Sequence, residues 1–156
     1  MLVLAEQILT LLREELSAYQ QLDSLLQAEQ EALKLGDIEQ LEHSTQAKSA
    51  VVQLLAVSVQ QRQQLFTSNP VLTDNGLEHF LSLYARPEDQ DIWEELLKQA
   101  AAAQEANQLN GLLIQQLGLQ TQKAIAVLQG QNPDADGLYD TRGQNTLSKR
   151  QRTIIS

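Results

Sequence analysis

The sequence predicts an all-α fold: an elongated antiparallel helical bundle of three long, coiled-coil-like helices, with one short helix and a C-terminal arm. Composition is the first observation behind this prediction. The 156 residues include 29 Leu and 24 Gln, both good helix formers, whereas aromatic residues make up 4%. The second observation is three long segments in which apolar residues recur every three or four positions, as on one face of a helix.

The first long helix is predicted over roughly residues 2–35. Its apolar stripe begins at Leu9 and Leu12 and continues to Leu33 with three- and four-residue spacing. Gly36 follows, and glycine readily adopts the left-handed conformation that ends many helices. Asp37 is a good N-cap for the next helix, so residues 35–37 predict a tight turn between two antiparallel helices.

The second long helix is predicted from about 37 to 67, and Ser68-Asn69-Pro70 ends it. Its predicted inner face follows an unbroken alternation of three- and four-residue steps that includes two basic residues. The members of this face are Ile38, Leu41, Thr45, Lys48, Val52, Leu55, Val59, Arg62 and Phe66.

A short helix is predicted between 73 and 86, capped by Asp74 or Asn75. Pro87 suits the first position of the last long helix, which is predicted over about 88–129. The inner face of that helix keeps a heptad-type register and is made of Trp93, Leu96, Ala100, Ala103, Asn107, Asn110, Ile114, Leu117, Thr121, Ala124 and Leu128.

The chain is predicted to consist of a helical body, residues 1–130, which ends at Gly130, and a turn-rich arm with a basic end, residues 131–156. Residues 1–140 carry 7 basic and 20 acidic side chains, whereas residues 141–156 carry four basic ones and no acid. An acidic body repels phosphates, so nucleic acid is not expected as a partner. The first residues lack the basic start of a signal peptide, and no apolar stretch approaches the roughly 18 residues of a membrane span. We therefore expect a cytoplasmic protein without membrane insertion.

Catalysis, metals and cofactors are not expected. The chain has no Cys and two His, which excludes thiolate chemistry and a multi-histidine metal cage. Residues 132–143 resemble a calcium loop, but Gly143 stands where the bidentate glutamate is needed, so a plain turn is the better interpretation. No nucleophile motif or phosphate-binding loop occurs.

The inner face of the last helix contains the candidate binding residues. Asn107 and Asn110 are polar residues at core-type positions, with Gly111 beside them. Such asparagines either fix the helix register or line a soft groove that a guest helix fills. The second interpretation makes Asn107, Asn110, Gly111, Ile114 and Leu117 the candidate cargo-binding residues.

The order of these features resembles the FlgN family of flagellar type III export chaperones. The resemblance rests on the long hairpin broken at residues 35–37, on Lys48 and Arg62 in its second helix, and on Trp93. Its most specific parts are Asn107-x-x-Asn110-Gly111 on a helix, followed by a Y-x-x-x-G turn from Tyr139 to Gly143.

This resemblance implies a chaperone that binds hook-associated proteins through their amphipathic C-terminal helix, prevents their premature assembly and delivers them to the export gate. It associates the tyrosine of the Y-x-x-x-G turn, here Tyr139, with passing cargo onward. We expect Tyr139, Gly143, Arg150 and Arg152 to dock to the gate, the two arginines as steering charges.

Two alternatives share the same helices. One is a homo-oligomeric coiled-coil scaffold without cargo, and the other is an export chaperone for a different flagellar substrate, such as the filament cap. The sequence does not separate a chaperone of hook-associated proteins from a chaperone of another export substrate, because a guest helix is recognised by its shape and apolar area.

Overall fold

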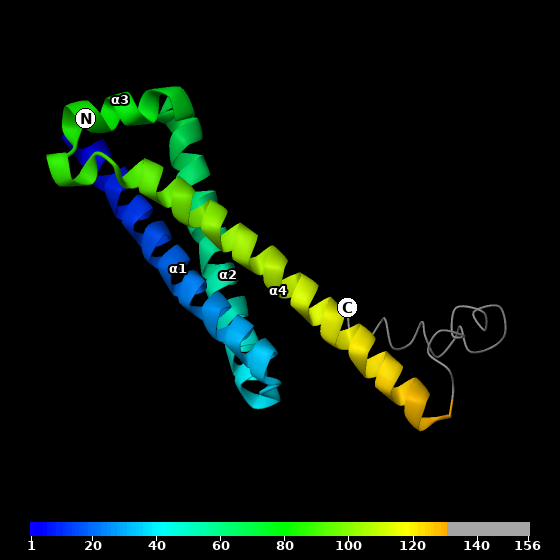
Figure 1. The fold of residues 1–156 in the computed structure, drawn as a ribbon. Helices are drawn as coiled ribbons and strands as arrows, with labels where there is room; N and C mark the ends of the chain where they lie inside the picture. The colour runs from blue at the N-terminus through cyan, green and yellow to red at the C-terminus, as the bar shows by residue number, and fades with distance from the viewer. Residues whose placement is uncertain (131–156) are drawn as a thin grey trace. The chain divides into compact units, whose positions relative to one another are not determined.

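The computed structural model describes residues 1–130, apart from the side chains of Asp74 and Asn75. Its helices are α1 (Leu2–Leu35), α2 (Ile38–Ser68), α3 (Asp74–Tyr84) and α4 (Ile92–Leu128), with short 3-10 turns η1 (Pro70–Leu72) and η2 (Pro87–Asp89) (Figure 1). No strand occurs within residues 1–130, and the predicted bundle of three long helices and one short helix is confirmed. The chain forms two compact units, Met1–Gln108 and Leu109–Ser156, so α4 contributes to both.

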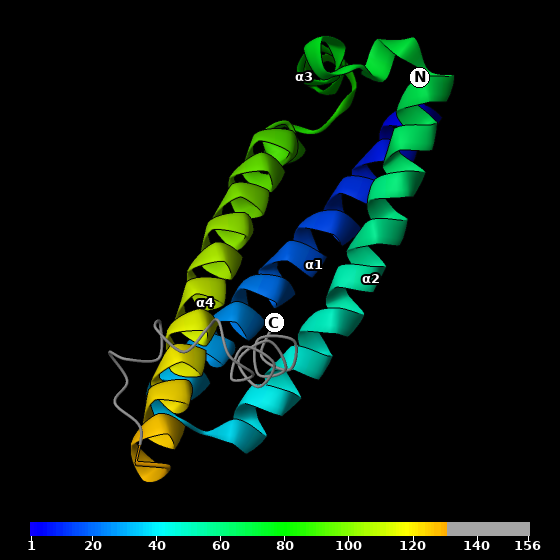
Figure 2. The same cartoon turned by 90° about the vertical axis from the view of Figure 1, so that its right-hand side faces the viewer.

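The hairpin of α1 and α2 closes as the sequence predicts. Gly36 is left-handed, with φ 67°, and its N–H donates to the carbonyl of Ala32. The Asp37 side chain caps α2 by accepting a hydrogen bond from the Gln40 N–H at 3.1 Å. Figures 1 and 2 show α1 and α2 lying side by side in opposite directions.

The main core lies at the end of the hairpin that holds the N-terminus. There α1, η1, α3 and the first turns of α4 meet around apolar side chains that are almost fully buried. Phe80 of α3 is 1% exposed, and Trp93 of α4 packs at 6.0 Å from the ring of Phe66. The buried members are Ala5, Ile8, Leu9, Leu12, Leu72, Leu77, Phe80, Leu81, Ile92, Trp93 and Leu96.

A second, smaller cluster lies further along the hairpin. It joins α1, α2 and the first part of α4 through Ala18, Leu22, Leu26, Leu55 and Ala103. Ala18 and Ala103 contribute small side chains to this cluster, and Leu55 is its buried member from α2. The predicted burial of Leu55 and Ala103 is thereby confirmed.

The predicted inner face of α2 is wrong at three positions, and one of them is Thr45, which is exposed. Ile38 is 70% exposed and Val52 is 48% exposed, whereas Ser44 and Ser58 are buried. A strict three-four alternation drifts around a helix of 3.6 residues per turn, so such a pattern strays from the buried face over eight turns. Serine also fits the closest approach of two helices because its side chain is small.

The start of α4 is another correction, since Pro87 opens η2 and α4 begins five residues later. The side-chain amide of Gln90 donates to the carbonyls of Ser82 and Ala85, at 3.4 and 3.3 Å. Asp89 accepts a hydrogen bond from Arg13 of α1 at 2.8 Å. These contacts hold residues 87–91 against α3 and α1, and α4 therefore begins only at Ile92.

Candidate protein-binding site

The α1–α2 hairpin contains an ion pair that is shielded from solvent. Glu15 of α1 accepts two hydrogen bonds from the guanidinium of Arg62 in α2, at 2.8 Å from Nε and 3.2 Å from Nη2. The glutamate side chain is 1% exposed and the arginine side chain 15%. Two roughly parallel N–H···O bonds fix both side chains in one geometry, so this pair specifies how α1 and α2 align.

A second pair lies closer to the turn of the hairpin. The Lys48 ammonium lies 2.9 Å from Oε2 of Glu29, whose side chain is 1% exposed. The Thr45 hydroxyl donates to the same carboxylate at 3.4 Å. A buried carboxylate needs such donors, because otherwise its transfer out of water costs several kcal/mol.

Both cations also contact the first part of α4. The Arg62 guanidinium lies 5.1 Å from the ring centre of Trp93, a cation–π distance. Lys48 Nζ donates to Oδ1 of Asn107 at 3.3 Å. The segment of α4 within the first unit is therefore fastened to the hairpin at two points, close to its start and close to its end at Gln108.

The sequence pattern predicts Lys48 and Arg62 on the inner face of α2 and does not identify their partners on α1. Glu15 and Glu29 are 14 residues apart, as are Lys48 and Arg62. Equal spacing is what antiparallel pairing of two helices requires. Glutamates three residues after Leu12 and Leu26, inside the apolar stripe, were the signal that could have revealed both pairs.

Tyr19 lies one turn from Glu15. Burial raises the pKa of the Tyr19 phenol, the negative charge of Glu15 raises it further, and the positive charge of Arg62 opposes both. The neutral phenol is therefore favoured here, and the tyrosine packs against both core clusters.

The predicted cargo-binding residues of α4 differ in exposure. Asn107 is exposed although it accepts the hydrogen bond from Lys48, and Gly111 is exposed with open space where a Cβ would stand. Ile114 is half-buried and Leu117 is 38% exposed. Asn110 is 1% exposed, so its side chain has almost no surface to offer a partner.

Exposed apolar side chains form a stripe on α4 that the sequence pattern does not predict. Leu109, Leu112, Leu119 and Val127 are 46 to 61% exposed and follow helical spacing, so they share one face of the helix. We call these four residues the outer stripe. From Leu109 to Gly130 the only charged side chain is Lys123, although the whole chain carries 20 acidic residues. An apolar, nearly uncharged helix face of this length is typical of a protein-binding surface.

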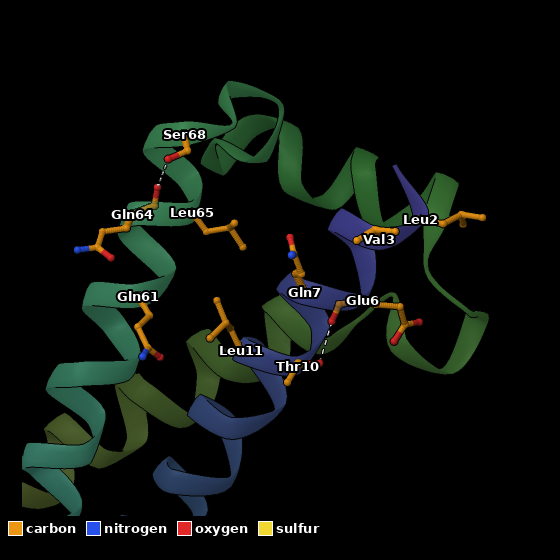
Figure 3. A pocket seen from close by; sticks show the side chains of 10 residues that line it. All are labelled: Leu2, Val3, Glu6, Gln7, Thr10, Leu11, Gln61, Gln64, Leu65 and Ser68. Carbon is orange, nitrogen blue, oxygen red and sulfur yellow. Dashed lines mark hydrogen bonds between the residues drawn. The ribbon is translucent and has the colours of Figure 1, made fainter.

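An open groove lies between the first turns of α1 and the last turns of α2, within the first unit (Figure 3). Its volume is about 850 Å³. Leu11 of α1 and Leu65 of α2 project into it from opposite sides. The full lining is Leu2, Val3, Glu6, Gln7, Thr10, Leu11, Gln61, Gln64, Leu65 and Ser68.

Residues 1–130 contain neither a metal-binding cluster of side chains nor a helix suited to a membrane. No three His, Asp or Glu side chains converge there as metal ligands would. None of the helices in this range combines the length and the apolar character that crossing a bilayer requires.

The chain was compared with known protein families to interpret the outer stripe and the groove. The family model described as FlgN protein matches residues 1–146. The chain belongs to the FlgN family. No curated protein and no solved structure matches the chain.

FlgN proteins are flagellar export chaperones, a family not known for catalysis. In this FlgN protein the exposed apolar surfaces of α4 and of the groove are therefore candidate sites for other proteins. The predicted gate-docking residues Tyr139, Gly143, Arg150 and Arg152 lie outside the described residues, as does the predicted arm, 131–156.

Proposed function

We propose that the protein is a cytoplasmic chaperone that binds hook-associated proteins, keeps them from assembling prematurely and delivers them to the flagellar type III export gate. Membership of the FlgN family supports export chaperoning in general. The observation that carries the proposal further is the outer stripe of α4, with its exposed Leu109, Leu112, Leu119 and Val127.

An amphipathic cargo helix fits this surface for physical reasons. Its apolar face would cover the four side chains of the outer stripe, and because each is about half exposed, its burial would contribute about 1 kcal/mol before the cost of ordering. Between these apolar positions α4 carries the polar residues Gln116 and Lys123 and no acidic residue. A cargo helix of either charge therefore meets little electrostatic repulsion there. The cargo's C-terminal helix, which would otherwise assemble, is the segment we assign to this face.

The earlier candidates Asn107, Gly111, Ile114 and Leu117 extend this surface around the helix. Asn110 belongs to the proposal only as a positioning residue, since it is 1% exposed. Tyr139, Gly143, Arg150 and Arg152 remain our proposal for the contact with the export gate, with the tyrosine as an anchor of large contact area and few rotatable bonds.

Light scattering of the full chain, alone and with a purified hook-associated protein, tests the proposal. A monomer that forms a 1:1 complex is expected. A stable dimer or tetramer that ignores the cargo supports a homo-oligomeric scaffold instead. A complex with the filament-cap protein and none with hook-associated proteins would support a chaperone function with a different cargo.

A further inference from the structure

The open groove between α1 and α2 is a concave feature that neither the ion pairs nor the α4 surface uses. Neither helix fills it, because Leu11 and Leu65 project into it without closing it (Figure 3). Leu2 and Val3 at its edge are 70% and 73% exposed. Its volume of about 850 Å³ lies within the usual range of ligand sites, about 300–1,000 Å³.

The length of the groove limits what it holds. Its lining on α1 runs from Leu2 to Leu11, nine residues apart, which corresponds to about 14 Å of helix. On α2 it runs from Gln61 to Ser68, about 10 Å. This room suits two to three helical turns and is too little for the roughly 800 Å² per partner of a standard protein interface. A short helix with apolar anchors at i, i+3 or i+4, and i+7 fits these dimensions.

The charged residues in and near the groove indicate which partner helices it favours. Glu6 is the one ionisable side chain in the lining, and the exposed Glu14 lies two turns along α1. Two cationic side chains of the same helices are engaged elsewhere, Arg13 with Asp89 and Arg62 with Glu15. Among the described residues no ion pair involves Glu6 or Glu14, so both carboxylates are available to the cations of a partner.

We propose that this groove is a second docking site, which takes a short, basic amphipathic helix of a partner protein. Two or three apolar side chains of that helix occupy the space between Leu11 and Leu65. A Lys or Arg at its edge pairs with Glu6, and the amides of Gln7, Gln61 and Gln64 bind its polar flank. The site lies wholly in the first unit and does not depend on the cargo surface proposed for α4.

The test uses the full chain and two capped 11-residue peptides with leucine at positions 2, 5, 6 and 9. Lysine fills the remaining positions of one peptide and glutamate those of the other. Titration by calorimetry should give micromolar binding of the Leu/Lys peptide and at least tenfold weaker binding of the Leu/Glu peptide. Equal binding of both peptides would overturn the proposal.

Variants locate the site. Glu6→Lys and Leu11→Gln should each weaken Leu/Lys binding at least fivefold, whereas the charge control Glu39→Lys and the apolar control Leu83→Gln should not. Thr10→Lys changes an exposed lining residue outside the core clusters and should also weaken binding, which guards against a folding defect in Leu11→Gln. Unchanged binding in Glu6→Lys and Thr10→Lys would contradict the proposal.

Two further readouts separate this site from its alternatives. The double variant Leu112→Lys with Leu119→Lys, on the outer stripe, should leave peptide binding to the groove unchanged. The groove and the proposed cargo surface are therefore tested independently, and either proposal can fail without the other. Light scattering tests self-occupation. If the full chain self-associates and Glu6→Lys returns it to a monomer, the groove holds a second copy, and the external helix is excluded.

Discussion

Glu15 and Arg62 are joined by two hydrogen bonds across the hairpin, with the glutamate 1% exposed. Arg62 also lies against the rings of Phe66 and Trp93. One ion pair therefore connects α1, α2 and the start of α4. The pair at Glu29 and Lys48 repeats this arrangement two heptads away and reaches α4 through Asn107.

Breaking the first pair from one side should be costly. Arg62→Met leaves a buried carboxylate without its cation and should lower the free energy of unfolding by about 3–5 kcal/mol. The double variant Glu15→Met with Arg62→Met should recover most of that loss, because no buried charge remains. Urea unfolding of the three proteins measures this. The exposed pair Glu94–Lys98 is the control, and Glu94→Gln should change stability by less than about 0.5 kcal/mol.

Leu55 and Leu54 form a matched test of the α2 register. Leu55 is 6% exposed within the second core cluster, whereas its neighbour Leu54 is 54% exposed. Leu55→Ala should lower the free energy of unfolding by about 2–4 kcal/mol, and Leu54→Ala by well under 1 kcal/mol. Similar losses for both in chemical denaturation would mean that the inner face of α2 is wrongly assigned.

Tyr19 provides a prediction about pH. Because its folded pKa is raised above 10.0, neutral Tyr19 stabilises the fold fully below the unfolded pKa, and that contribution is lost as pH rises through the folded pKa. Glu15→Gln removes a negative charge and should lower the pKa of Tyr19, although burial still holds it above the ordinary value. Ultraviolet titration of the phenolate, with Tyr19→Phe to identify its signal, checks this. A Tyr19 pKa that stays unchanged in Glu15→Gln would show that the carboxylate does not act on the phenol.

Two glycines within helices should respond in opposite ways to alanine. A Cβ on Gly76 of α3 would stand 2.6 Å from the carbonyl oxygen of Val71, so Gly76→Ala should lower the melting temperature. Gly111 of α4 has nothing within 4 Å of the added atom, and Gly111→Ala should stabilise the helix by about 0.5–1 kcal/mol. If Gly111→Ala weakens cargo binding while raising the melting temperature, the glycine serves close approach of the cargo.

The sequence predicted the parts of the fold that depend on local chemistry. Gly36 and Asp37 marked the turn because left-handed backbone and helix capping are properties of single residues. The prediction for segment 87–91 is wrong because its conformation depends on contacts outside the segment: Asp89 meets Arg13, 76 residues away, and Gln90 meets the carbonyls of Ser82 and Ala85.

The candidate site was predictable only in part. Asn107 and Asn110 look alike in sequence, yet one is exposed and the other is 1% exposed, because burial depends on what the helix meets in space. The outer stripe was not predicted because, over the whole of α4, its four apolar residues are fewer than those of the predicted inner face. The groove joins residues about 60 positions apart, which no local pattern reveals.

The most direct test of the account is a titration of the outer stripe against cargo. Full-length protein, the double variant Leu112→Lys with Leu119→Lys, and the matched exposed control Leu83→Lys are titrated with a hook-associated protein, and their melting curves are recorded alongside. The account predicts binding by the full chain and the control, at least a tenfold loss in the double variant, and unchanged melting. Unimpaired binding by the double variant would contradict the assignment of cargo to this face of α4.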